Sequence, residues 1–271
     1  MAGSSGRPVQ KKPPVLDTGV PHTARTWNYW LGGKDNYPVD RKAGDEIRAL
    51  MPEIVDAACA VRVFLGRVVR YLAGEVGIRQ FLDVGTGLPT ANNTHEVAQS
   101  TAPECRIVYA DNDPLVLVHA RALLTSSPEG VTDYVDADLR DPDKILREAA
   151  KTLDFTQPTA LMLLGVLNFI LDNDEAHAIV NQLLDALPAG SYLVLSHPTP
   201  EVDGDAVHKS VRIWNEGGGT PPITARSRQE LLRFFDRLEL LEPGVVSVSR
   251  WRPYIGPPPE VFEYCGVGRK L

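Results

Sequence analysis

The stretch from Gln80 to Thr90 constrains this chain more than any other part of the sequence. Apolar residues at Ile78 and Phe81-Leu82 indicate a short strand, and Gly85-Thr86-Gly87 then turns the chain toward a helical segment. Ligands of open parallel sheets bind at the carboxyl ends of the strands. Glycines there let the backbone approach a ligand where a Cβ would clash. Asp83, at the end of the predicted strand, would place a carboxylate beside such a turn.

Four interpretations of this turn compete. A dinucleotide site prefers Gly-x-Gly-x-x-Gly, but Thr90 occupies the third glycine position and Asp83 would repel a pyrophosphate. A phosphate-binding loop needs Gly-Lys-Ser/Thr, which the chain does not have here. Asp-x-Gly-x-Gly after a strand resembles the first motif of class I S-adenosylmethionine-dependent methyltransferases, whose cationic ligand suits an acidic loop. From these residues alone, an ordinary strand-to-helix turn is the remaining alternative.

Two further predicted strands also end close to acidic residues. In Asp111-Asn112-Asp113-Pro114, Asp113 and Pro114 read as a helix cap and first helical position, which leaves Asp111 free to accept from both ribose hydroxyls. A plain turn residue is the alternative for Asp111. Asp138 follows a strand predicted over 131–135 and can accept from an adenine amino group, while Leu139 can pack on the ring or offer its backbone amide. Together with Asp83, these carboxylates match an amino group, a ribose and an adenine.

The apolar run over 160–164 is typical of a central strand that is buried on both faces. Gly165 follows it, where the methyl-bearing sulfur of the ligand would lie. A strand over 192–195 comes next. An oxygen or nitrogen acceptor can need a base. The weak candidates for that role are Tyr29, Lys34, Asn168 and His197.

The chain before residue 75 divides into two parts. Residues 1–20 are rich in Gly, Ser, Pro and Lys, which predicts a disordered arm. Residues 21–74 predict a helical extension, with helices over 38–50 and 53–74. Its aromatic residues suit either a lid over a ligand or a segment anchored by its rings. Three arginines of the second helix read as its solvated face: Arg62, Arg67 and Arg70.

Residues 75–271 predict the ligand-binding domain, and its last third is the least regular part. The triple glycine at 217–219 indicates a substrate gate or a linker, and a linker is favoured. Strands over 238–246 and 261–267 are expected to form a closing hairpin at the sheet edge.

Composition and charge exclude several classes of protein. The formal net charge of −7 argues against a general nucleic-acid binder. A local cluster of arginines is still compatible with a small basic patch. The three cysteines have no zinc-binding spacing, so no metal site is expected, and buried free thiols are favoured. The chain shows neither an apolar run of about 18 residues nor a signal core. We therefore expect a cytoplasmic protein without membrane contact.

Several longer segments resemble the bacterial S-adenosyl methyltransferase family over nearly all of residues 21–270. They are Tyr29–Asn36, Gln80–Thr90, Val108–Pro114, Phe234–Leu240 and Trp251–Pro253. The resemblance implies an α/β, Rossmann-like class I methyltransferase sheet of seven strands, the last antiparallel, with S-adenosylmethionine as cofactor. It also implies that Leu31–Asn36 lies near the cofactor. The chain has Arg237 where the family pattern has glycine, which affects a helix end and not the cofactor site.

The site predicted from residues and resemblance together comprises Asp83, Gly85, Thr86, Gly87, Asp111, Asn112, Asp138, Leu139 and Gly165. The leading hypothesis is an S-adenosylmethionine-dependent methyltransferase acting on a small molecule, with no acceptor assigned. One alternative is a regulatory or sensor protein that binds S-adenosylmethionine or S-adenosylhomocysteine without methyl transfer. A nicotinamide-dependent oxidoreductase is disfavoured by Asp83 and the missing third glycine.

Overall fold

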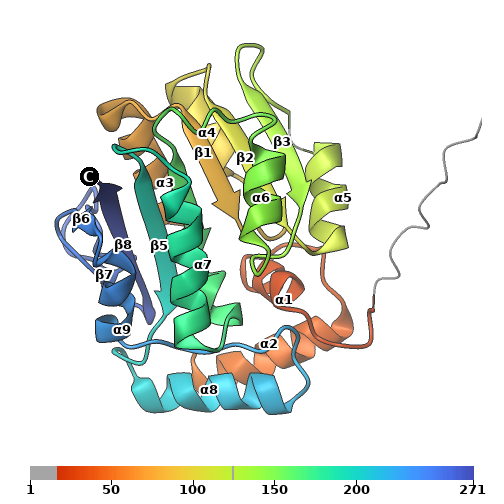
Figure 1. Ribbon diagram of the computed structural model, residues 1–271. Helices are drawn as coiled ribbons and strands as arrows, with labels where there is room; N and C mark the ends of the chain where they lie inside the picture. Colours follow the sequence, from red (N-terminus) through yellow and green to blue (C-terminus); the bar gives the residue numbers. More distant parts are fainter. Residues whose placement is uncertain (1–16, 124) are drawn as a thin grey trace, which may run out of the picture.

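The computed structural model describes residues 17–123 and 125–271, so most of the arm predicted over 1–20 lies outside the described residues. One sheet forms its centre, with the strand order β3-β2-β1-β4-β5-β8-β6 and a short β7 paired to β8 (Figure 1). The strands are β1 (Gln80–Val84), β2 (Arg106–Asp111), β3 (Val131–Asp136), β4 (Ala160–Leu164), β5 (Tyr192–Pro198), β6 (Leu238–Leu240), β7 (Val246–Ser247) and β8 (Glu263–Lys270).

Strand directions confirm the predicted fold class. Strands β3, β2, β1, β4 and β5 are parallel, and β8 runs antiparallel to both β5 and β6. The closing antiparallel pair expected at the sheet edge is present, because β6 is the edge strand and pairs with β8. The strand expected over 238–246 is divided into β6 and β7. Pro243 and Gly244 stand between them, and proline cannot donate to a strand ladder, while Gly244 has a φ of +85°.

Helices cover both faces of the sheet. They are α1 (Thr23–Trp30), α2 (Pro38–Leu50), α3 (Ile54–Arg70), η1 (Tyr71–Val76), α4 (Thr94–Thr101), α5 (Pro114–Leu123), α6 (Pro142–Ala149), η2 (Leu167–Phe169), α7 (Asn173–Asp185), α8 (Gly204–Glu216), α9 (Arg228–Leu232) and η3 (Arg233–Phe235). Among the described residues, no helix is both long and apolar enough to cross a membrane.

The two faces of the sheet carry separate apolar cores. Side chains alternate between the faces of a strand. Phe81 and Met162 therefore pack on one face, with α2, α3, α4 and α8, whereas Leu82 and Leu161 pack on the other, with α6, α7 and α9. Figure 1 shows α1, α2 and α8 gathered beyond the carboxyl ends of the parallel strands. These three helices therefore close the end of the sheet at which a ligand is expected.

Helix α8 ends directly before the triple glycine at 217–219, which the sequence predicted to be a gate or linker. Asp203 caps it by accepting from the backbone of Ala206 at 3.4 Å, and Val207 and Trp214, seven residues apart, bury one face. The triple glycine follows directly and packs against this helix. A Cβ on Gly219 would lie 2.3 Å from the Trp214 ring. The glycines thus allow close packing at the end of α8, which the prediction of a linker missed.

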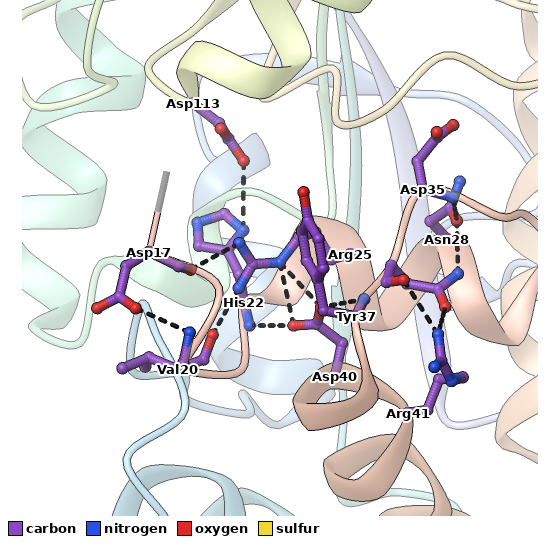
Figure 2. Close-up of polar contacts among 12 residues, drawn as sticks. Asp17, Val20, His22, Arg25, Asn28, Asp35, Tyr37, Asp40, Arg41 and Asp113 are labelled. Carbon is purple, nitrogen blue, oxygen red and sulfur yellow. Dashed lines mark hydrogen bonds and ion pairs between the residues drawn. The ribbon is translucent and has the colours of Figure 1, made fainter. Parts of the chain in front are cut away.

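A buried ion pair fixes the amino-terminal helices (Figure 2). The Nε atom of Arg25 lies 3.0 to 3.1 Å from the two carboxylate oxygens of Asp40, and the two residues are 2% and 0% exposed. Asp40 also accepts from the backbone amides of His22 at 2.9 Å and Tyr37 at 2.8 Å. The start of α1 and the first turn of α2 therefore meet on one carboxylate.

Replacing Asp40 with asparagine should destabilise the fold, because a buried guanidinium loses its countercharge. Breaking a buried pair from one side costs about 3 kcal/mol or more, so urea unfolding should show a loss of that order. Asp45→Asn is the matched control on the same helix, since Asp45 is exposed and accepts from the Tyr29 hydroxyl at 2.8 Å. Equal losses in the two variants would contradict a special role for the buried pair.

Candidate functional site

A cavity of about 290 Å³ opens at the carboxyl ends of the parallel strands. All nine residues of the predicted cofactor site line it: Asp83, Gly85, Thr86, Gly87, Asp111, Asn112, Asp138, Leu139 and Gly165. They come from the ends of four strands and the loops that follow, so the parallel sheet brings together positions up to 82 residues apart in sequence. The sheet therefore brings into one cavity every residue that was predicted to touch the cofactor.

Asp83 forms the buried floor of the cavity at the end of β1. Its side chain is 5% exposed, and Thr94 at the start of α4 donates to Oδ2 at 2.6 Å. Burial raises the pKa of Asp83 to about 6, against the opposing effects of the Thr94 hydrogen bond and the Arg62 charge. A cationic ligand beside it would favour the ionised carboxylate.

Asp111 holds the glycine turn and the end of β2 together. One carboxylate oxygen accepts from the backbone amide of Gly87 at 3.0 Å, and the other accepts from Asp113 at 2.9 Å. Burial raises the pKa of Asp111 to about 6 despite these donors. A Cβ added to Gly87, whose φ is +66°, would meet no atom within 4 Å. The turn thus leaves open space above a carboxylate whose position is fixed.

Asp138 links the ends of β2 and β3. It accepts from the side chain of Asn112 at 2.8 Å and from the backbone amide of Arg140 at 2.8 Å. At the end of β4, Gly165 has a φ of +64°, and a Cβ there would also enter open space. Because β3 is an edge strand and β4 a central strand, Asp138 and Gly165 line different parts of the same cavity.

The four weak candidates for an acid or base, Tyr29, Lys34, Asn168 and His197, do not all reach the cavity. Only Asn168 lines the cavity, where its Oδ1 atom is buried without a hydrogen-bond partner among the described residues. Both ring nitrogens of His197 are occupied, by Arg226 at 2.7 Å and by the Pro198 carbonyl at 2.8 Å. Tyr29 and Lys34 lie outside the cavity lining, and Lys34 is exposed. The last three therefore offer nothing to an acceptor in this arrangement.

The loop from Leu31 to Asn36 packs around Asn28, near the end of α1. Leu31 alone of this segment lines the cavity. Asn28 accepts from the backbone of Asp35 and the side chain of Asn36, both at 3.0 Å (Figure 2). A Cβ on Gly33 would lie 2.3 Å from the Asn28 side chain. The segment therefore wraps closely around Asn28 and orients α1, which itself forms one cavity wall.

Arg62 and α8 are parts of the cavity that the sequence did not reveal. Arg62, predicted to be solvated, lines the cavity and donates to the carbonyls of Ala91 and Asn92 at 3.1 and 3.0 Å. Its Nε atom is buried with no partner among the described residues. The only sequence signal for Arg62 was its place on a helix that precedes the glycine turn.

Comparisons with known proteins identify the family of the chain. The model of the S-adenosyl methyltransferase family matches residues 9–271. The chain belongs to this family. Its activity is therefore methyl transfer with S-adenosylmethionine as cofactor. A protein of the DUF574 family from Streptomyces avermitilis is 44% identical, with 94% of this chain and 99% of that chain covered and a TM-score of 0.90.

Two further solved structures extend the comparison. A putative methyltransferase from Thermobifida fusca is 42% identical, with 95% of this chain and 98% of that chain covered and a TM-score of 0.86. The plantazolicin methyltransferase BpumL, solved with S-adenosylhomocysteine, shares only the fold, at 10% identity, 92% and 96% coverage and a TM-score of 0.52. Among curated proteins, no sequence matches the chain.

Cofactor affinity should fall in acid. Asp83 and Asp111 each have a pKa raised to about 6, so both are mostly ionised at pH 7.5 and mostly protonated at about pH 5. A protonated carboxyl no longer accepts from a ligand with both oxygens. One pH unit below the pKa, the binding-competent fraction falls about tenfold for each carboxylate. Calorimetric titration with S-adenosylhomocysteine at the two pH values measures this, and equal affinities would contradict it.

Proposed function

We propose that the protein methylates a small molecule inside the cavity, with the cofactor held by the residues predicted from sequence. In this arrangement Asp83 accepts from the cofactor amino group, Asp111 from the ribose hydroxyls and Asp138 from the adenine amino group. Leu139 packs on the adenine. The cofactor supplies the transferable methyl group, and the protein supplies position and electrostatics.

The chemistry of the cavity supports this placement. Four carboxylates line one end of it, because Asp113 lies there beside the three assigned above, and the cofactor carries a sulfonium, an amino group and two ribose hydroxyls. Gly87 and Gly165 leave open space where other residues would project a Cβ. Such positions let the backbone approach a bulky ligand closely. The residues present therefore fit the cofactor.

Arg62 completes the cofactor end in this proposal. The cofactor has a carboxylate at its amino acid end, next to the amino group assigned to Asp83. The positive charge of Arg62 acts on Asp83, so the two side chains lie near each other. The free Nε–H of Arg62 can donate to that carboxylate. Asp83 and Arg62 would then recognise the two charges of one amino acid group.

The partial cover of the cavity is the observation that supports a small acceptor. Helices α1 and α8 line the cavity opposite the strand ends, and aromatic rings of Trp27, Trp30 and Trp214 are part of that wall. A site covered in this way excludes water from the reacting atoms and holds a nucleophile in line with the methyl group. A folded protein or a duplex would need an open face instead.

Calorimetric titration with S-adenosylhomocysteine tests the cofactor placement. Asp111→Asn should weaken binding by about 1.5–3 kcal/mol, the scale of a hydrogen bond to a charged group. Asp133→Asn is the matched control, because Asp133 is an exposed strand residue that does not line the cavity. Unchanged affinity in Asp111→Asn would rule out the ribose assignment, and failure of the wild type to bind would rule out the cofactor site.

A further inference from the structure

The far end of the cavity contains a group of buried polar side chains that the cofactor placement does not use. Asn168 follows β4, Ser196 lies on β5, Ser210 on α8 and Glu263 at the start of β8, and all four line the cavity. Across the sheet, β1, β4 and β5 lie between β2, which carries Asp111, and β8. The group is thus at the end of the cavity farthest from the predicted ribose and adenine contacts.

Each of these side chains has an oxygen atom without a hydrogen-bond partner in the described part of the chain. The unpaired atoms are Asn168 Oδ1, Ser196 Oγ, Ser210 Oγ and Glu263 Oε2, and each residue is at most 8% exposed. Native proteins leave few buried polar atoms unsatisfied, so each such atom calls for an explanation. The Asn168 and Glu263 oxygens can accept, and the two serine hydroxyls can donate or accept, so this cavity end suits a polar ligand that brings hydrogen-bond donors.

Among these four residues, Glu263 is the one whose burial destabilises the fold most, because it carries an ionisable carboxyl. Alternation along β8 puts it on the same face as Cys265 and Val267, which pack in the core next to α3. Among the described residues no Lys, Arg or His side chain forms an ion pair with it. Burial alone raises the pKa of Glu263 to about 8. A carboxyl placed in this way lowers stability and is typical of a functional site.

The walls around this end are apolar. Val207, Val211 and Trp214 of α8 line the cavity, as does Phe262 next to Glu263. Apolar walls with a few convergent polar atoms are characteristic of small-molecule sites. The ligand suited to this end has an apolar or aromatic body and one strongly donating group.

We propose that Glu263, Ser196, Ser210 and Asn168 bind the methyl acceptor, and that the acceptor is an amine on an apolar or aromatic body. This inference rests on the proposed function, because it takes the other end of the cavity as the cofactor site. An ammonium group brings several N–H donors and a charge opposite to that of an ionised Glu263. An anionic acceptor would be repelled by an ionised Glu263, so an amine is favoured over an anion at this end.

The test is calorimetric titration of the protein saturated with S-adenosylhomocysteine. The probes are methylammonium, phenethylamine and tryptamine, each paired with the alcohol of the same shape: methanol, 2-phenylethanol and tryptophol. At least one amine should bind about tenfold more tightly than its alcohol. Glu263→Gln should remove this preference while S-adenosylhomocysteine affinity stays within about twofold of wild type. If no amine is preferred, or if the variant keeps the preference, the acceptor proposal is overturned.

Two controls separate the possible failures. Glu260→Gln, an exposed residue three positions earlier that does not line the cavity, should keep the amine preference. Ser210→Ala should weaken amine binding several-fold without changing S-adenosylhomocysteine binding, which tests the site even if Glu263→Gln folds poorly. Loss of S-adenosylhomocysteine binding in Glu263→Gln or Ser210→Ala would assign this end to the cofactor and overturn the acceptor proposal. A wild type that does not bind S-adenosylhomocysteine would overturn the proposed function itself.

Discussion

The carboxylate of Asp111 is the contact on which the cofactor end of the cavity depends. It accepts from Gly87 in the turn after β1 and from Asp113 at the start of α5, so one side chain sets the spacing of two strand ends. The backbone of the glycine turn could otherwise adopt many conformations. Because this carboxylate is buried and its position is fixed, the ribose hydroxyls assigned to it would meet a preorganised acceptor.

The amino-terminal helices cover part of the cavity at the carboxyl ends of the strands. In a parallel sheet alone, the carboxyl ends of the strands face solvent. Here the Arg25–Asp40 pair orients α1 against α2, and His22 lies 3.3 Å from Asp113, next to the strand end that carries Asp111. The cover is therefore tied to the cofactor end by named polar contacts as well as by apolar packing. Enclosure of this kind suits the transfer of a methyl group between two small molecules.

The acidic side chains at the two ends of the cavity differ in how their oxygens are satisfied. Asp111 and Asp138 already accept backbone or side-chain hydrogen bonds, which keeps their geometry fixed. Glu263 and Ser196 at the other end have buried oxygens without partners. An unsatisfied site gains most from a ligand that brings its own donors, and this is the physical basis for assigning it to the acceptor.

The sequence by itself determined the sheet and the cofactor end. Glycines and carboxylates at strand ends are local signals, since a turn with positive φ and a polar group beside it need only a few neighbouring residues. The sequence was less informative for Arg62, α8 and Glu263: it predicted a solvated Arg62, no helix over 204–216, and a Glu263 that is part of a strand at the sheet edge. Their roles depend on segments up to about 200 residues apart that meet at one end of the sheet. Which polar residue on a helix or strand faces a cavity is decided by that packing, and periodicity within one element cannot supply it.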